Sequence, residues 1–331
     1  MQDFLALKKQ KSEEIPSRIE VKETQEIKQE TKETNQNKTV EEVYNEAMQL
    51  LDTNQYHEGI KQLQELATGG YHFAQSQLGK LYLDGKLVAH NEGKAHEWNQ
   101  KAAEQGNIDA QKCISEDYIQ GRGVPQNYDK AMEWYQKVAE QGDPDSQYIL
   151  GRMYETGRMY KARRIRPRDY QKAAEYYQKA ADQGQMEALC RMGILYARGL
   201  GVHRDYEKAA KFLEITAEKE IVDAIVELSV LYDNGYGVEK NQVKSIGLLE
   251  RAAQQGSAVA CDMLARRYEE GDGVKRSESI AKAYYEKAFD LYSIEASSGD
   301  VDAMIYIAHK YRFGIRISQD VEKAKEWYDK A

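Results

Sequence analysis

The fold of this chain is decided by the segment Ala74-Gln75-Ser76-Gln77-Leu78-Gly79-Lys80-Leu81-Tyr82-Leu83-Asp84-Gly85. Its pattern, Ala-x-x-x-Leu-Gly-x-x-Tyr-x-x-Gly, returns six more times with changes at the Leu-Gly pair. The later copies begin at Ala110, Ser146, Ala188, Ala224, Ala260 and Ala303. Four of the six intervals are 36 residues, the others are 42 and 43, and the Tyr and the last Gly occur in all seven copies. Self-similarity at such a period is typical of a repeat architecture.

A second pattern follows each copy of the first. It is clearest in Lys94-Ala95-x-x-Trp98-x-x-Lys101-Ala102-Ala103-x-x-Gly106, where apolar residues recur three and four positions apart. This spacing puts them on one stripe of a helix. Each repeat is therefore predicted to be a helix, a Gly-containing turn, a second helix and a closing Gly. The small residue after the Leu, such as Gly79, would let the two helices approach closely, and the Tyr would fill the space between them.

These two patterns resemble the Sel1-like repeat family, a close relative of the tetratricopeptide repeats, over about residues 70–331. The turn motif Gly-x-Gly-Val stands intact at 121–124, 199–202, 235–238 and 271–274, and departs from the pattern after Gly157 and Gly314. The resemblance implies an all-α fold, an α/α superhelical solenoid of about seven Sel1-like helix-turn-helix repeats plus a degenerate N-terminal capping repeat. It also implies a protein that binds other proteins, often as a bacterial adaptor.

The chain divides by composition and period into an arm, a cap and the repeats. Residues 1–39 hold eight basic and eight acidic residues and little apolar surface, so we predict a disordered N-terminal arm. Residues 40–73 keep helical spacing without the Leu-Gly pair, as a degenerate capping repeat would. The seven repeats of 74–331 are predicted at 74–109, 110–145, 146–187, 188–223, 224–259, 260–302 and 303–331.

Charge and cysteine content exclude several classes of protein. The 331 residues carry 47 Lys and Arg against 55 Asp and Glu, a net charge of −8, which argues against a general nucleic-acid binder. Three cysteines cannot form a disulfide framework. We expect Cys113 and Cys261 in the core and leave Cys190 open between core and groove. With no signal-peptide core, we expect a cytoplasmic protein, the alternative being export by a route that leaves no signal peptide.

Catalytic and metal-binding motifs are not expected. The six histidines are scattered over different repeats with no pair at ligand spacing, so we predict no metal and no cofactor. A hydrolase of β-lactams or cell-wall precursors is the enzyme alternative, and it would need a Ser-x-x-Lys motif or another nucleophile and base. We expect no such catalytic motif and predict that the chain is not an enzyme.

The first helix of each repeat would line a concave groove, as in tetratricopeptide relatives. Its non-core positions carry basic residues interleaved with apolar ones, which predicts a peptide or protein partner with some acidic groups. The alternative is that these are merely solvated helix positions. The candidate groove residues are Lys80, Lys112, Tyr148, Arg152, Glu155, Ile194, Arg198, Val226, Val230, Asp233, Asn234, Arg266, His309 and Arg312.

The two long intervals have different causes. The 42-residue copy lengthens its turn with a basic loop, predicted to meet an acidic protein surface and less readily nucleic acid. Its basic residues are Arg158, Lys161, Arg163, Arg164, Arg166 and Arg168. The 43-residue copy carries its extra residues within 289–295 at helical spacing, which predicts a second helix longer by two turns.

We therefore interpret the sequence as a non-catalytic scaffold that binds a peptide or protein partner in its groove. A secreted or host-interaction effector with the same solenoid is the alternative. The exposed C-terminal repeat could also pair two copies of the chain. No apolar run reaches the ~20 residues that a membrane-spanning helix needs.

Overall fold

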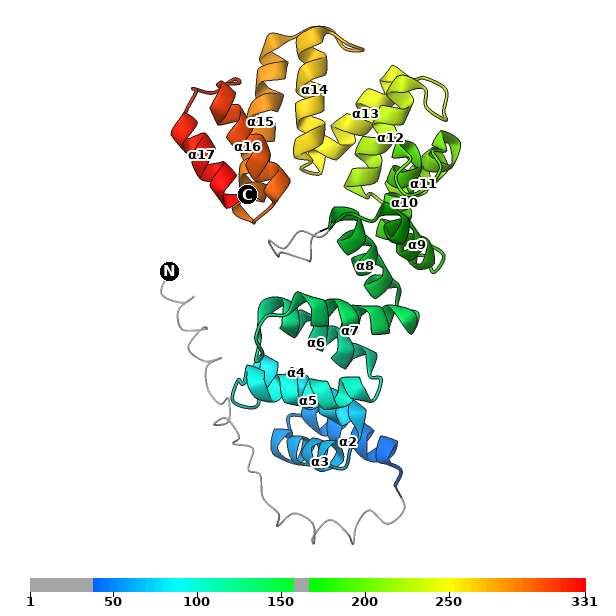
Figure 1. Ribbon diagram of the computed structural model, residues 1–331, viewed down its shortest axis with the longest axis vertical. Helices are drawn as coiled ribbons and strands as arrows, with labels where there is room; N and C mark the ends of the chain where they lie inside the picture. Colours follow the sequence, from blue (N-terminus) through cyan, green and yellow to red (C-terminus); the bar gives the residue numbers. More distant parts are fainter. Residues whose placement is uncertain (1–37, 158–166) are drawn as a thin grey trace, which may run out of the picture. The chain divides into compact units, whose positions relative to one another are not determined.

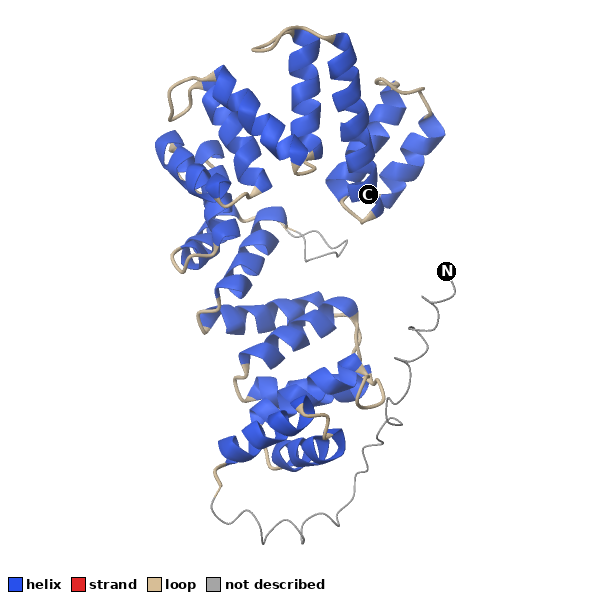
Figure 2. Cartoon of the chain, turned by 180° about the vertical axis from the view of Figure 1, so that it is seen from behind, coloured by secondary structure: helices blue, strands red, loops and turns tan. Residues whose placement is uncertain are grey.

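A computed structural model describes residues 38–157 and 167–331 (Figures 1 and 2). These residues form sixteen α-helices and no strand, which confirms the all-α, helix-turn-helix prediction. The helices are α2 (Val40–Asp52), α3 (Tyr56–Thr68), α4 (His72–Asp84), α5 (Glu92–Glu104), α6 (Ile108–Gln120), α7 (Tyr128–Glu140), α8 (Pro144–Thr156), α9 (Tyr170–Ala181), α10 (Met186–Arg198), α11 (Tyr206–Glu218), α12 (Val222–Asn234), α13 (Gln242–Gln254), α14 (Ala258–Glu270), α15 (Glu278–Ser297), α16 (Val301–Phe313) and α17 (Val321–Lys330).

The chain forms two compact units, one through Ser146 and one from Gln147 onward. In the first unit, Leu63, Leu78 and neighbouring alanines form the main core cluster. In the second unit, the largest cluster lies among α10 to α15 and includes Leu213, Ile225 and Leu264. The repeated leading Ala is buried in both units; Ala110, for example, lies in one core cluster with Ala102 and Ala103 of the preceding helix.

Residues at the helix ends explain why the helices begin and end where they do. Most of the second helices start with an Asn, Asp or Ser whose side chain accepts a hydrogen bond from a backbone N–H in the first turn; Asn91 and Asp205 are examples. Such caps satisfy N–H groups that have no partner within the helix. The first helices end at a Gly in the left-handed conformation, such as Gly199 with φ +68°. Glycine adopts this conformation at no steric cost, which is why it occurs in every copy.

The recurring Tyr of the first helix packs under a Lys from the second helix. In six repeats the Lys ammonium lies 4.0–5.7 Å from the ring centre, as Lys94 lies over Tyr82. Lys208 also donates a hydrogen bond to the Tyr196 hydroxyl at 2.6 Å. The sixth repeat has Ile280 at the lysine position.

The second Gly of the turn motif brings each repeat against the one before it. A Cβ added to Gly201 would lie 2.1 Å from the backbone oxygen of Tyr170, the first residue of α9. A Cβ on Gly237 would lie 2.2 Å from the same atom of Tyr206, the first residue of α11. In both cases, the turn of one repeat rests on the start of the preceding second helix.

The last described repeat departs from this arrangement because α15 is longer. It has 20 residues where α13 has 13, so the predicted two-turn extension is confirmed. Arg316 stands at the position of the second Gly, and its guanidinium lies 4.2 Å from the ring centre of Tyr285. Tyr285 lies seven residues after Glu278, the first residue of α15. The turn after α16 therefore meets the middle of α15 instead of its start.

Candidate functional site

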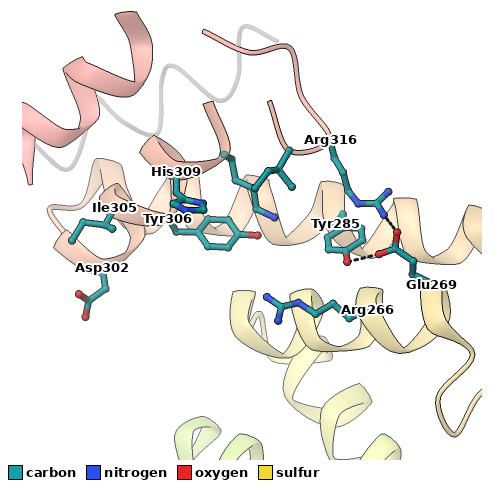
Figure 3. Close-up of a pocket in the computed structure, with 10 residues that line it drawn as sticks. Arg266, Glu269, Tyr285, Asp302, Ile305, Tyr306, His309 and Arg316 are labelled. Atoms are coloured by element: carbon teal, nitrogen blue, oxygen red, sulfur yellow. Dashed lines mark hydrogen bonds and ion pairs between the residues drawn. The ribbon is translucent and has the colours of Figure 1, made fainter. Parts of the chain in front are cut away.

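A pocket of about 740 Å³ opens where α14, α15, α16 and the displaced turn meet (Figure 3). Its walls combine aromatic, aliphatic and charged side chains from all four elements. The lining residues are Arg266, Glu269, Tyr285, Asp302, Ile305, Tyr306, His309, Lys310, Ile315 and Arg316. The pocket brings together Arg266 and His309, two candidate groove residues that are 43 positions apart in the sequence.

Buried Asp262 organises the floor of this pocket. Its carboxylate accepts a hydrogen bond from the Tyr306 hydroxyl at 2.7 Å and pairs with the Arg266 guanidinium, also at 2.7 Å. The Lys310 ammonium lies 3.6 Å away, and burial lowers the pKa of Lys310 while Asp262 opposes that shift. Burial, followed by the hydrogen bond to Asp262, raises the pKa of Tyr306. The floor is a fixed network of one carboxylate with three donors.

Glu269 organises the opposite wall. Its carboxylate accepts a hydrogen bond from the Tyr285 hydroxyl at 2.8 Å and pairs with the Arg316 guanidinium (Figure 3). The hydrogen bond from Tyr285, and after it the one from Arg316, lowers the pKa of Glu269. Burial and the bond to Glu269 raise the pKa of Tyr285 to about 12. Both oxygens of Glu269 are therefore engaged within the protein.

The other candidate groove residues of the second unit differ in exposure. Arg152, Arg198, Asn234 and Arg312 are exposed, whereas Tyr148, Glu155, Val226, Val230 and Asp233 are partly buried. The prediction for Ile194 is wrong, because this side chain is buried in the core cluster with Ile225 and Leu228. Cys190 is buried in the same cluster, so of the two alternatives left open for it, core and groove, the core is correct. Cys261 is buried as expected, and Cys113 is partly buried.

Several basic candidate groove residues form ion pairs with an acidic residue that lies in the first helix of the following repeat or just before it. In the first unit, the Lys80 ammonium lies 2.9 Å from Asp109 and the Lys112 ammonium 2.5 Å from Asp143. In the second unit, Arg198 pairs with Glu227. Arg152 instead approaches the Tyr148 hydroxyl at 3.4 Å. The first helices therefore present charge pairs rather than a purely cationic surface.

Five of the six predicted basic-loop residues lie outside the described residues: Arg158, Lys161, Arg163, Arg164 and Arg166. The sixth, Arg168, is exposed and donates a hydrogen bond to the Tyr170 hydroxyl at 3.1 Å. The acidic partner of this loop stays a prediction.

The expected absence of a Ser-x-x-Lys motif is wrong at the level of sequence, because Ser279-Ile280-Ala281-Lys282 has this spacing. Both polar residues are exposed near the start of α15, as its second and fifth residues. The Lys282 ammonium is 3.9 Å from Glu286, and the Ser279 hydroxyl is 3.2 Å from that of Ser277. Activation of a serine needs a base within hydrogen-bond reach, and among the described residues Lys282 makes no such bond to Ser279.

In the part of the chain that the structure describes, no three His, Cys, Asp or Glu side chains gather in a way that could hold a metal ion. Within it, too, no helix combines the length and apolar character needed to cross a membrane.

Sequence reasoning missed Tyr285, Tyr306, Lys310 and Arg316 as members of the site. Tyr306 and Lys310 lie on a first helix, outside the positions predicted to line the groove, and Tyr285 lies on a second helix. Two signals could have indicated the pocket: the 43-residue interval and the replacement of the second turn Gly by Arg316.

The helix pairs and their inter-repeat turns define an α-helical repeat protein of the kind that presents a surface to other proteins. A model described as "Sel1 repeat" matches residues 72–107, 118–143, 144–185, 187–220, 222–257, 258–293 and 301–331. The chain belongs to the Sel1 repeat family. Sel1 repeat proteins are generally non-catalytic scaffolds for protein interactions.

Solved structures show the same fold. A Sel1 repeat protein from Oxalobacter formigenes is 30% identical over 88% of this chain and 82% of its own, with a TM-score of 0.61. The protective antigen c5321 of uropathogenic Escherichia coli, which displays an SLR fold, is 28% identical over 89% of this chain and 64% of its own, with a TM-score of 0.60. A comparison with curated protein sequences gives no match.

Proposed function

We propose that this chain is a non-catalytic scaffold and that its second unit binds a peptide segment along the first helices of the repeats. The observation that carries the proposal is the meeting of Arg266 and His309 with exposed Ile305 at one open pocket. These residues come from two consecutive first helices, and they combine charge with apolar surface. Such a mixture suits a ligand anchored by an apolar side chain and oriented by polar contacts.

Charged residues on the first helices of the second unit allow the proposal to be tested. Replacing Arg152 and Arg266 together by Glu should weaken peptide binding by about tenfold or more, because two attractive charges become repulsive. The probe is a synthetic peptide selected from a random twelve-residue display library on the full chain. Its affinity is measured by fluorescence anisotropy.

A matched control keeps the same change of charge on another surface. Lys211 and Lys219 are exposed on and just after the second helix α11, so the Lys211→Glu, Lys219→Glu variant should bind the peptide as the parent chain does. Equal affinity of the parent and the Arg152→Glu, Arg266→Glu variant would contradict the proposal. A library that yields no binder would contradict it as well.

A further inference from the structure

We propose that the pocket between α14, α15 and α16 receives an acidic side chain, Asp or Glu, of the bound peptide, with an apolar side chain of that peptide packing beside it. This inference rests on the proposed function and specifies the chemistry of one anchor point. It concerns only the second unit, where all the residues involved lie.

The first step is the origin of the pocket. In repeats with the regular turn, a Gly with no side chain rests on the start of the preceding second helix, as Gly201 does on Tyr170. The seven extra residues of α15 move this meeting point to Tyr285. Arg316 fills the Gly position with a long cationic side chain in the left-handed conformation, φ +62°. The extension thus replaces a closed contact between repeats by an open pocket with a charged wall.

The second step is the hydrogen-bonding capacity of the walls. Glu269 already accepts bonds on both oxygens, and Asp262 lies buried beneath the pocket and accepts from Tyr306 and Arg266. A guanidinium carries five N–H donors, and Arg266 and Arg316 each direct one terminal nitrogen to these carboxylates. The Arg266 side chain is 65% exposed, while that of Asp262 is 7% exposed. Arg266 and Arg316 therefore keep donor capacity beyond these pairs, and the lining carboxylate outside the two networks is Asp302 of α16.

The third step is the direction of these donors. In Figure 3 the Arg266 guanidinium points into the space between α14 and α16, and Asp302 points away from both tyrosines. Lys310 lies over the rings of Tyr285 and Tyr306, 5.3 and 4.8 Å from their centres. An internal cation thus already covers the aromatic faces, which disfavours a cationic ligand. A carboxylate can form paired hydrogen bonds with a guanidinium, which makes it the matching group.

The fourth step is the apolar surface beside the donors. Ile305, His309 and Phe313 follow one another every four residues along one face of α16, and Ile305 and Phe313 are 42% and 55% exposed. Ile315 adds a further exposed aliphatic side chain at the pocket wall. Exposed apolar side chains grouped at a pocket are typical of a binding surface. A peptide whose acidic residue enters the pocket can place an apolar neighbour on this stripe.

The experiment is a double-mutant cycle between protein and peptide. Peptides selected on the full chain are synthesised with acetylated and amidated ends, so that the only carboxylates are side chains. Changing the acidic residue to its amide should weaken binding to the parent chain about tenfold, as for a charge-assisted pair. The same change in the peptide should weaken its binding to the Arg266→Gln, Arg316→Gln variant by less than twofold.

Two controls keep the outcome decisive. The Lys211→Gln, Lys219→Gln variant should show the full tenfold effect, because these lysines lie outside the pocket. Ile305→Asp changes an exposed residue outside the described ion pairs. It should also weaken binding of the acidic peptide to the chain. This second variant keeps the test valid if the arginine variant proves unstable by thermal unfolding.

The outcomes separate the two proposals. If peptides bind but the amide change costs the same in the parent and both pocket variants, the pocket inference is overturned while the scaffold proposal stands. The same holds if selection favours peptides without acidic residues, or peptides that lose binding on amidation of their C-terminus. If no peptide binds the parent chain, both proposals fail.

Discussion

Replacing Gly201 by Ala is expected to destabilise the second unit by about 2–5 kcal/mol, although it adds a single methyl group. Gly201 adopts φ +69°, a conformation that costs a residue with a side chain about 1–2 kcal/mol. The added Cβ would also lie 2.1 Å from the backbone oxygen of Tyr170, which no rotamer change can move. The turn would have to withdraw from the start of α9 and lose the contact between repeats. Urea unfolding followed by circular dichroism measures the loss.

The variant Gly184→Ala separates the cost of the left-handed backbone conformation from the cost of losing the contact between repeats. Gly184 also has a positive φ, +86°, but an added Cβ would meet no atom within 4 Å. This variant should lose only the conformational cost of about 1–2 kcal/mol. Equal losses in the two variants would show that the contact between the turn and α9 contributes nothing to stability.

The helices and their pairing could be predicted because they depend on local spacing. An Ala recurring every 36 residues, with Leu and Tyr four and eight positions later, puts the same stripe inward in each repeat. Ala74, Ala188 and Ala260 are accordingly all buried completely. Ile194 was misplaced because its environment depends on the neighbouring helix α12, which covers it with Ile225 and Leu228.

The pocket could be predicted only in part. The 43-residue interval indicates a longer α15, but the point where the next turn lands depends on how α16 packs against α14 and α15. The charge pairs could also be predicted only in part. Lys80 and Asp109 are 29 residues apart, as are Arg198 and Glu227, but Lys80 is the sixth residue after its leading Ala and Arg198 the tenth, so the two pairs occupy different positions of the repeat. Reading the basic positions without their partners in the next repeat overstated the cationic character of the face.

One buried position carries an amide in one repeat and an aliphatic side chain in others. Asn99 is the eighth residue of α5, and Leu213 is the eighth residue of α11; both are fully buried. Each packs against the small residue of its first helix, Gly79 or Gly193. Neither amide atom of Asn99 has a hydrogen-bond partner among the described residues. An unsatisfied buried amide costs about 1–3 kcal/mol, so Asn99→Leu should stabilise the first unit by about that amount.

The reverse change, Leu213→Asn, should destabilise the second unit by about 3–5 kcal/mol, because it removes apolar contacts and buries an amide at once. Thermal and urea unfolding of the two variants measure the opposite signs. A change of side-chain volume alone cannot explain a gain of stability in Asn99→Leu. This variant enlarges a side chain against Gly79, and overpacking by itself would cost about 1–3 kcal/mol. A gain of stability in Asn99→Leu would therefore show that the unsatisfied amide outweighs any overpacking, whereas a loss would contradict that prediction.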